Sequence, residues 1–332
     1  MAQTTFEEIS ASDCASLYNQ GYSISELRAA SGYSYTRMRN TLLKSGVKLR
    51  TKKEAAKSMI NRHPEWKNQF LKYTLLPDSR QLSDSKIKLL FFLFTEGCIH
   101  KSKVQFTNNE AILRDSFSVL MRQVYGIETK TTNRNVAYVS SVEIARDLAA
   151  YNMKTLIPEE IMCKLLQSQK LTSDVLRIFA DTEGSVIISV RKGPRNYTVA
   201  DRRVVIACTN ENVKLQLVKL LKTLGIIGHA NQVGVLVMDE NSLREFDQQV
   251  GFSSGVKVVR KKAGYGLWYN YEKASLLKLL IRIYNEQKTK GNRGLHLGVF
   301  RNCKTKDEVV EILRFWYNEQ GGNRLGTDFR RD

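Results

Sequence analysis

Cysteine, histidine and long apolar runs are scarce in this sequence, and each scarcity excludes a class of protein. The five cysteines are scattered, odd in number and without a Cys-x-x-Cys pair: Cys14, Cys98, Cys163, Cys208 and Cys303. We therefore expect reduced thiols in an intracellular protein rather than a disulfide framework. The four histidines are equally dispersed, which argues against a structural zinc site.

Apolar runs long enough for a membrane are also missing. No run approaches the roughly 20 residues that a spanning helix needs. The run Leu89 to Phe94 is bracketed by Lys88 and Glu96. The first residues lack the basic-then-apolar order of a signal peptide. We expect no membrane partner and a cytoplasmic or nucleoid-associated location.

Acidic residues are few relative to basic ones. The chain has 33 Asp and Glu against 52 Lys and Arg, a formal net charge of +19, and a sequence pI of about 9.7. A fold does not need this excess, whereas a polyanionic partner does; a membrane surface would be the other attractant. At 332 residues the chain can bury a core and form more than one domain.

The stretch from Leu171 to Val186 predicts a helix that passes directly into a strand. Its apolar residues recur at spacings of three and four, at Val175, Ile178, Phe179 and Thr182. The helix is expected over 172–183, with a cap at Thr172 or Ser173, and Gly184 ends it before a strand. Glu183 is unusual, because a carboxylate in the last turn lies at the negative end of the helix dipole.

The same arrangement occurs earlier in the chain. A capped apolar helix, expected over 83–96, ends at Thr95-Glu96-Gly97 and again leads into a strand. The segment 104–108 (VQFTN) matches 206–210 (IACTN). In both copies an amphipathic helix, further strand residues and a short helix follow. These two copies of helix-strand-strand-helix-strand-strand-helix indicate an internal duplication.

The two stretches resemble the paired signature helices of a single-chain LAGLIDADG homing endonuclease, over about residues 82 to 262. The resemblance implies two helices packed side by side and an acidic residue, before each final glycine, that binds a catalytic divalent metal. Matched by position these are Glu96 and Glu183, with the backbone near Gly97 and Gly184 beside them. The implied cofactor is Mg²⁺, for which Mn²⁺ can substitute.

The chain departs from the family pattern at three positions. Phe94 stands where the motif has Asp, although Asp181 keeps it in the second copy. Phe91 and Ile178 replace an early glycine, so the helices are expected to lie further apart there. Where the family has Gln or Lys near the metal, this chain offers Asn108 and Asn210, with Lys261 after the second repeat as a substitute for the lysine.

Basic residues in the predicted hairpins are candidates for contact with double-stranded DNA. The second copy is longer between the signature helix and the Thr-Asn marker, which predicts a long twisted hairpin; a two-stranded ribbon fits the major groove. The alternative is a solvated basic hairpin. The candidates are Lys101, Lys103, Lys130 and Arg134 in the first copy, and Arg191, Lys192, Arg195, Arg202 and Arg203 in the second.

The first 55 residues predict a separate helix-turn-helix unit. Ser23 and Glu26 form a capping box at the second helix, Gly32 turns the chain, and Ser34 begins a third helix that Gly46 closes. The alternative is a three-helix packing unit without DNA contact. The third helix would read DNA through Tyr35, Thr36, Arg37, Arg39 and Asn40, followed by a basic exit strand with Lys48, Arg50, Lys52 and Lys53.

The expected fold class is α+β, with a pseudo-symmetric pair of αββαββα repeats. A small all-α domain precedes the repeats and a helical extension follows them. The predicted boundaries are 1–55 for the helix-turn-helix, 56–81 for a connector, 82–157 and 158–262 for the repeats, and 263–332 for the extension. The internal pseudo-two-fold predicts a monomer.

The predicted function is site-specific, metal-dependent hydrolysis of double-stranded DNA, with Glu96 and Glu183 as metal ligands. Adjacent helix-end carboxylates repel each other, and a divalent ion removes that penalty. Two alternatives remain open: a non-cleaving DNA-binding regulator built on a degenerate core, and an RNA-binding intron maturase.

Overall fold

The computed structural model describes residues 10–63, 75–192, 198–259, 266–286, 300, 303 and 305–321. The chain divides into two units, Met1–Thr74 and Leu75–Asp332. Two of the candidate residues, Lys261 and Arg195, lie outside the described residues, as does the turn between the strands of the predicted long hairpin. For Arg191 and Lys192 the structure describes the backbone alone.

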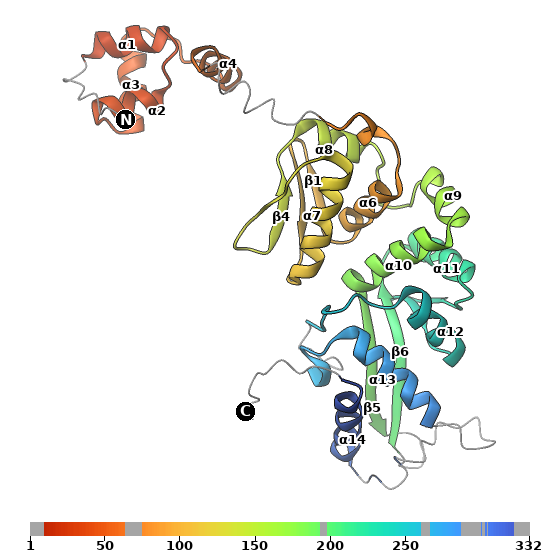
Figure 1. Ribbon diagram of the computed structural model, residues 1–332. Coiled ribbons are helices and arrows are strands. Elements are labelled where there is room, and N and C mark those ends of the chain that lie inside the picture. Colours follow the sequence, from red (N-terminus) through yellow and green to blue (C-terminus); the bar gives the residue numbers. More distant parts are fainter. Residues whose placement is uncertain are drawn as a thin grey trace. The chain divides into compact units, whose positions relative to one another are not determined.

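The described part of the first unit contains α1 (Ala11–Asn19), α2 (Ile24–Ser31), α3 (Tyr35–Lys44) and α4 (Lys52–Arg62) (Figure 1), of which α2 and α3 begin at the predicted caps. Ser23 and Glu26 form the expected capping box, and Gly32 ends α2 with a left-handed φ of 70°. Ser34 caps α3. The core is a small apolar cluster of Cys14, Tyr18, Leu27, Met38, Leu42 and Val47.

The predicted basic exit strand is wrong for Lys52 and Lys53, whereas Lys48 and Arg50 lie in the non-helical segment before α4. Thr51 and Glu54 form a capping box that begins α4, so Lys52 and Lys53 are helical. Local hydrogen bonding decides this, because the Thr51 hydroxyl and the Glu54 carboxylate satisfy the first donors of a helix.

The second unit contains two repeats with the predicted order of elements. The first comprises the 3₁₀ turn η1 (Pro77–Arg80), then α6 (Asp84–Glu96), β1 (Gly97–His100), β2 (Lys103–Thr107), α7 (Ala111–Tyr125), β3 (Lys130–Thr131), β4 (Val136–Val139) and α8 (Val142–Ala149). The second comprises α9 (Glu159–Gln167), α10 (Gln169–Glu183), β5 (Gly184–Lys192), β6 (Thr198–Ala207), α11 (Glu211–Thr223), β7 (His229–Ala230), β8 (Gly234–Val237), α12 (Glu240–Glu245) and the π-helical η3 (Phe246–Val250).

The two sheets have the same topology. Each is four-stranded and antiparallel, in the order β1-β2-β4-β3 and β5-β6-β8-β7. The fold class predicted for the repeats, α+β with a duplicated αββαββα unit, is therefore confirmed. α10 begins at Gln169 with Ser168 as its cap, earlier than the Thr172 or Ser173 start that the sequence predicted.

Gly97 and Gly184 follow the signature helices for a steric reason. Both have extended backbones, with φ of −95° and −82°, so neither is a left-handed helix cap. A Cβ at Gly97 would lie 2.3 Å from the Leu93 Cα, and one at Gly184 would lie 2.3 Å from the Ala180 carbonyl oxygen. Only glycine lets each strand leave its helix this close to the preceding turn.

The register of the sheets corrects the matching of the two repeats. Gly97 pairs with Phe106, and Gly184 pairs with Ile206. The Asn108 N–H donates to the Asn135 carbonyl, directly before β4, and the Cys208 N–H donates to the Val233 carbonyl, directly before β8. The structural counterpart of Asn108 is therefore Cys208. The Thr-Asn match in the sequence is offset by two residues.

The long hairpin of the second repeat is confirmed. β5 and β6 pair continuously from Gly184↔Ile206 to Lys192↔Thr198, whereas β1 and β2 pair from Gly97↔Phe106 to His100↔Lys103. After the short 3₁₀ turn η4 (Gly266–Trp268), the helices α13 (Lys273–Glu286) and α14 (Lys306–Glu319) pack against β5 (Figure 1). The helical extension thus covers the hairpin of one repeat.

Candidate functional site

The signature helices α6 and α10 pack side by side. Phe91, Phe94 and Phe179 form an edge-to-face cluster between them, with ring centroids 5.7–6.3 Å apart. Lys88 Nζ of α6 lies 3.4 Å from the Asp174 carboxylate of α10. Aromatic rings thus fill the interface between the two helices.

Glu96 and Glu183 line one cavity at the ends of these helices. The cavity has a volume of about 130 Å³, and both carboxylate residues contribute to its wall. Each is partly exposed, and each follows a threonine whose hydroxyl donates to a carbonyl of the preceding helical turn. The remaining lining residues are Thr182, Gly184, Ser185, Val205, Ala207, Val233, Val258, Val259 and Lys273.

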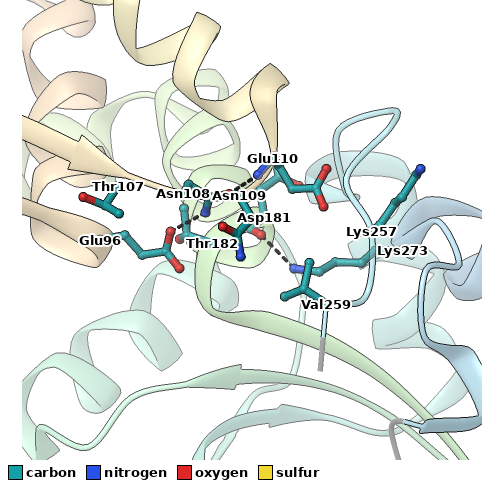
Figure 2. A pocket seen from close by; sticks show the side chains of 10 residues that line it. All are labelled: Glu96, Thr107, Asn108, Asn109, Glu110, Asp181, Thr182, Lys257, Val259 and Lys273. Atoms are coloured by element: carbon teal, nitrogen blue, oxygen red, sulfur yellow. Dashed lines mark hydrogen bonds between the residues drawn. The ribbon is translucent and has the colours of Figure 1, made fainter. Parts of the chain in front are cut away.

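An adjoining cavity of about 170 Å³ extends the site toward the first repeat (Figure 2). Asn108 faces Glu96 there, and its Nδ2 donates to the Glu96 carboxylate. The Asn108 Oδ1 accepts from the Glu110 N–H at 2.7 Å. The amide therefore fixes the position of the Glu96 carboxylate relative to the beginning of α7.

Lys273 is a central residue that sequence reasoning did not find. It is the first residue of α13, lines both cavities and is 6% exposed. Its Nζ donates to the Asp181 carbonyl at 2.7 Å and lies 3.4 Å from that of Ala180. The sequence held one weak signal for Lys273. A cation in the first turn of a helix is disfavoured by the positive end of the helix dipole, just as the Glu183 carboxylate is disfavoured by the negative end of α10.

Burial lowers the pKa of Lys273 to about 8, and the surrounding carboxylates oppose that shift. Those carboxylates are Asp181, Glu96, Glu110 and Glu183. The ammonium therefore lies at the electrostatic centre of the site. It offsets the negative charge of the helix end and of both candidate ligands.

The segment after η3 closes the site from the side of the second repeat. The Asp181 carboxylate, 4% exposed, accepts from the Ser253 N–H at 2.9 Å and from the Ser253 hydroxyl at 2.6 Å. Burial raises the pKa of Asp181, although these two hydrogen bonds act to lower it. Burial likewise raises the pKa of Glu110, whose carboxylate accepts from the Lys257 backbone. Asp181 therefore positions backbone around the site.

The second half of the site differs from the first. Asn210, a predicted catalytic residue, caps α11: its Oδ1 accepts from the Val213 N–H at 3.1 Å. The position equivalent to Asn108 is Cys208, whose thiol pKa is raised by burial and by the charge of Glu183. The catalytic role of Asn210 stays a prediction, and the bond that its side chain makes here is the cap of α11.

The candidates for DNA contact in the first repeat are placed on or beside one face of its sheet. Lys103 projects from β2 with its Nζ 4.4 Å from the centre of the Tyr138 ring. Lys101, Lys130 and Arg134 are exposed in the turns and the edge strand. The opposite face buries Val104 and Phe106. This leaves the basic face open.

Strand alternation separates Arg202 from Arg203. Arg202 is 8% exposed, and its guanidinium carbon lies 3.8 Å from the centre of the Tyr284 ring of α13. Arg203 pairs with Ile187 and points to the opposite, partly exposed face. The expectation of DNA contact is wrong for Arg202, because the helical extension covers its face of the hairpin.

In the first unit the residues predicted to read DNA are all exposed. Tyr35, Thr36, Arg37, Arg39 and Asn40 lie on the outer face of α3, opposite the buried Met38 and Leu42. Arg50 is different. Its guanidinium donates to the carbonyls of Gly21, Tyr18 and Tyr22 at 2.6–3.1 Å and covers the Tyr18 ring at 4.0 Å. Arg50 holds the unit together, so the prediction that it contacts DNA is corrected.

The part of the chain that the structure describes has neither a metal-binding cluster of side chains nor a helix that could span a membrane. No group of three His, Cys, Asp or Glu side chains is arranged to hold a metal by itself. None of the described helices has the length and apolar character to cross a bilayer.

Comparison with known proteins gives structural matches alone. No protein-family profile and no curated protein sequence matches the chain. The meganuclease I-AabMI bound to uncleaved DNA is 15% identical, with 72% of this chain and 99% of that chain covered and a TM-score of 0.41. I-SmaMI bound to uncleaveable DNA is 15% identical over 73% and 99%, with a TM-score of 0.38. Full-length WhiA from Thermatoga maritima is 15% identical over 72% and 69%, with a TM-score of 0.35. These are LAGLIDADG proteins, as the sequence resemblance indicated, and the likeness is one of fold.

Proposed function

We propose that this chain is a site-specific endonuclease that hydrolyses double-stranded DNA with a divalent metal. The observation that carries the proposal is the shared cavity of Glu96 and Glu183. The two carboxylates are 87 positions apart in the sequence and meet because two duplicated helices pack together. A structural role does not require two helices to end in carboxylates facing one cavity, because each glutamate opposes its own helix dipole.

The donor set fits magnesium. Mg²⁺ is bound in phosphoryl-transfer sites by one or two carboxylates, water and the phosphate of the substrate. Glu96 and Glu183 supply two such carboxylates beside the extended backbone of Gly97 and Gly184. A divalent ion held there would activate a water near neutral pH and relieve charge on the leaving oxygen.

The surrounding side chains have separate tasks in this proposal. Asn108 orients the Glu96 carboxylate through its amide N–H. Lys273 holds the carbonyl end of α10 and supplies positive charge where a phosphate would approach. Asp181, through its two bonds to Ser253, keeps the closing segment in place. Lys273 takes the part that the sequence assigned to Lys261.

DNA binding rests on the basic surfaces that flank the site. The net charge of +19 favours a polyanion, and the exposed Lys101, Lys130 and Arg134 lie in the turns and the edge strand of the sheet that starts at Gly97. Contacts of this kind are made mostly to phosphates and position the duplex. The exposed face of α3 in the first unit offers a second surface for the same duplex.

One observation favours a second candidate, a non-cleaving DNA-binding regulator. The buried ammonium of Lys273 already compensates the carboxylates around it. A site balanced in this way can persist as a structural element without an ion. The two candidates share the DNA surface and differ in whether the carboxylates act on the phosphodiester.

The test is cleavage of a plasmid library with a randomised insert by the full-length protein in Mg²⁺ or Mn²⁺. Sequencing of linear ends should give one defined site, and EDTA should abolish the ends. The double variant Glu96→Gln, Glu183→Gln is the matched control and should bind the selected site without cutting it. Selective binding by wild-type protein without cutting in either metal would establish the regulator instead.

A further inference from the structure

In the second repeat a lysine ammonium binds the carbonyl end of the signature helix. The Lys273 Nζ donates to the Asp181 carbonyl oxygen at 2.7 Å and lies 3.4 Å from that of Ala180 (Figure 2). The C-terminal end of a helix carries partial negative charge, so a cation there is favourable. Lys273 belongs to α13, which is part of the extension that follows the second repeat.

The first repeat has a cavity at the corresponding place. Counted back from the glutamate that ends each helix, Leu93 and Phe94 are the counterparts of Ala180 and Asp181. Both Leu93 and Phe94 line a cavity of about 500 Å³. Its other walls come from the start of β1, the end of α8 and the turn after α8. The cavity therefore lies beside the carbonyl end of α6, in the position that Lys273 takes at α10.

The floor of this cavity is apolar. Leu90, Leu148 and Met153 line it and are at most 8% exposed. Phe94 adds to this character, because the second repeat has at the same position the carboxylate of Asp181, which binds the closing segment. Volumes of roughly 300–1,000 Å³ with mostly apolar walls are typical of small-molecule sites. The floor is thus suited to the aliphatic chain of a ligand.

The charge of the ligand follows from the two ends of the cavity. At the rim lies Lys154, whose side chain is exposed, so that water and salt screen its charge. At the inner end lies Leu93, 7% exposed, in the last turns of α6. The negative end of the helix dipole is screened less there. Glu96, which is one of the carboxylates that interact with the Lys273 ammonium, ends the same helix. The inner end therefore favours a cation.

We propose that this cavity binds a primary alkylamine. Its ammonium contacts the carbonyl end of α6 as the Lys273 ammonium contacts that of α10, and its aliphatic chain covers the apolar floor. A bound amine places a cation near Glu96, so it is an effector of the candidate site. The binding site is independent of the endonuclease activity, whereas the effect on cutting rests on the proposed function.

Calorimetric titration of the full-length protein with hexylammonium, hexanoate and hexanol, in metal-free buffer without DNA, tests the site. Hexylammonium should bind one-to-one and more tightly than the other two, which have chains of the same length. Pentylammonium should bind about fourfold more weakly than hexylammonium, because one methylene fewer is buried. Equal or tighter binding of hexanoate or hexanol, or no binding of hexylammonium, would overturn the inference.

Ala149→Phe and Ala150→Phe are matched variants at neighbouring exposed positions, the last residue of α8 and the one after it. Ala149 lines the cavity and Ala150 does not. Ala149→Phe should therefore abolish hexylammonium binding at an unchanged melting temperature, and Ala150→Phe should retain it. Lys154→Ala should bind the amine at least as tightly as wild type, because a like charge is removed. Binding that survives Ala149→Phe, or is lost in Lys154→Ala, would contradict the assignment.

Cleavage of the selected DNA site tests the effector role. Saturating hexylammonium should change the cleavage rate of wild type and leave that of Ala149→Phe unchanged. The same rate with and without the amine in wild type would overturn the effector role. A chain that binds the amine as described and never cuts would uphold the site and overturn the endonuclease alone.

Discussion

The Lys273 ammonium donates to the Asp181 carbonyl oxygen at 2.7 Å, so the first residue of α13 closes the last turn of α10. The contact joins the helical extension to a signature helix 92 positions earlier in the sequence. It also introduces a buried cation among carboxylates that otherwise repel one another. The site is therefore formed by three segments of the chain: the two repeats and the extension.

Stability should depend on pH through Lys273. The native state releases this proton near pH 8, whereas the unfolded chain keeps it to about 10.5. Between these values the unfolded state binds more protons, so the free energy of unfolding should rise with pH. The full effect is on the order of 3 kcal/mol. Denaturant unfolding of wild type and Lys273→Met in EDTA, from neutral to alkaline pH, should show the rise in wild type alone; parallel curves would contradict it.

The candidate ligands should separate cutting from binding. Glu183→Gln keeps the shape of the side chain and removes the charge that a divalent ion requires. Cleavage of the selected site should fall by several orders of magnitude, because activation of water and relief of the leaving group are lost together. Affinity in Ca²⁺ should be retained. Glu96→Gln should behave alike, and nicking of one strand is the pattern to look for on gels; full cleavage by either variant would remove that glutamate from the ligand set.

Asp181→Asn should give a defect of stability rather than chemistry. The carboxylate accepts two hydrogen bonds from Ser253 while almost fully buried, and an amide presents only one acceptor oxygen. The expected loss is about 1–3 kcal/mol. Calorimetry should show a lower melting temperature, and cleavage per folded molecule should change little. Loss of cleavage at unchanged stability would assign Asp181 to the chemistry.

Arg50 and Arg39 should have opposite effects in the first unit. Arg50→Ala removes a guanidinium bound to three backbone carbonyls, so the unit should lose on the order of 2 kcal/mol of stability. Arg39→Ala, on the exposed face of α3, should leave stability unchanged and weaken DNA binding. Thermal melts and duplex titrations of the two variants distinguish these outcomes, and a stable, weakly binding Arg50→Ala would reverse the assignment.

Affinity for duplex DNA should depend steeply on salt. Each phosphate neutralised by a basic side chain contributes about −0.9 to the slope of log K against log salt. With several exposed basic residues on the first sheet and on α3, the slope should be steeper than about −5. Titrations at increasing KCl measure it. A slope near zero would mean that the basic surface has another partner.

The sequence by itself determined the elements and their duplication. The capping residues Ser23 and Ser34 begin helices where predicted, and the apolar spacing of 172–183 falls within α10. These features are local, because a helix cap and an amphipathic period each depend on residues that are close together in the sequence. Glu96 and Glu183 were found for the same reason: each ends an apolar helix before a glycine.

Only the tertiary structure decided which side chains meet at the site. Lys273 comes from the extension, and nothing near it in the sequence indicates that it lies between two helix ends. The register of β6 assigned Cys208, not Asn210, to the place of Asn108, because a strand offset of two residues keeps the same alternation of faces. Arg202 and Arg203 are the same residue type and are adjacent in the sequence. Packing of α13 on one face of the hairpin makes one a core residue and the other a candidate reader of DNA.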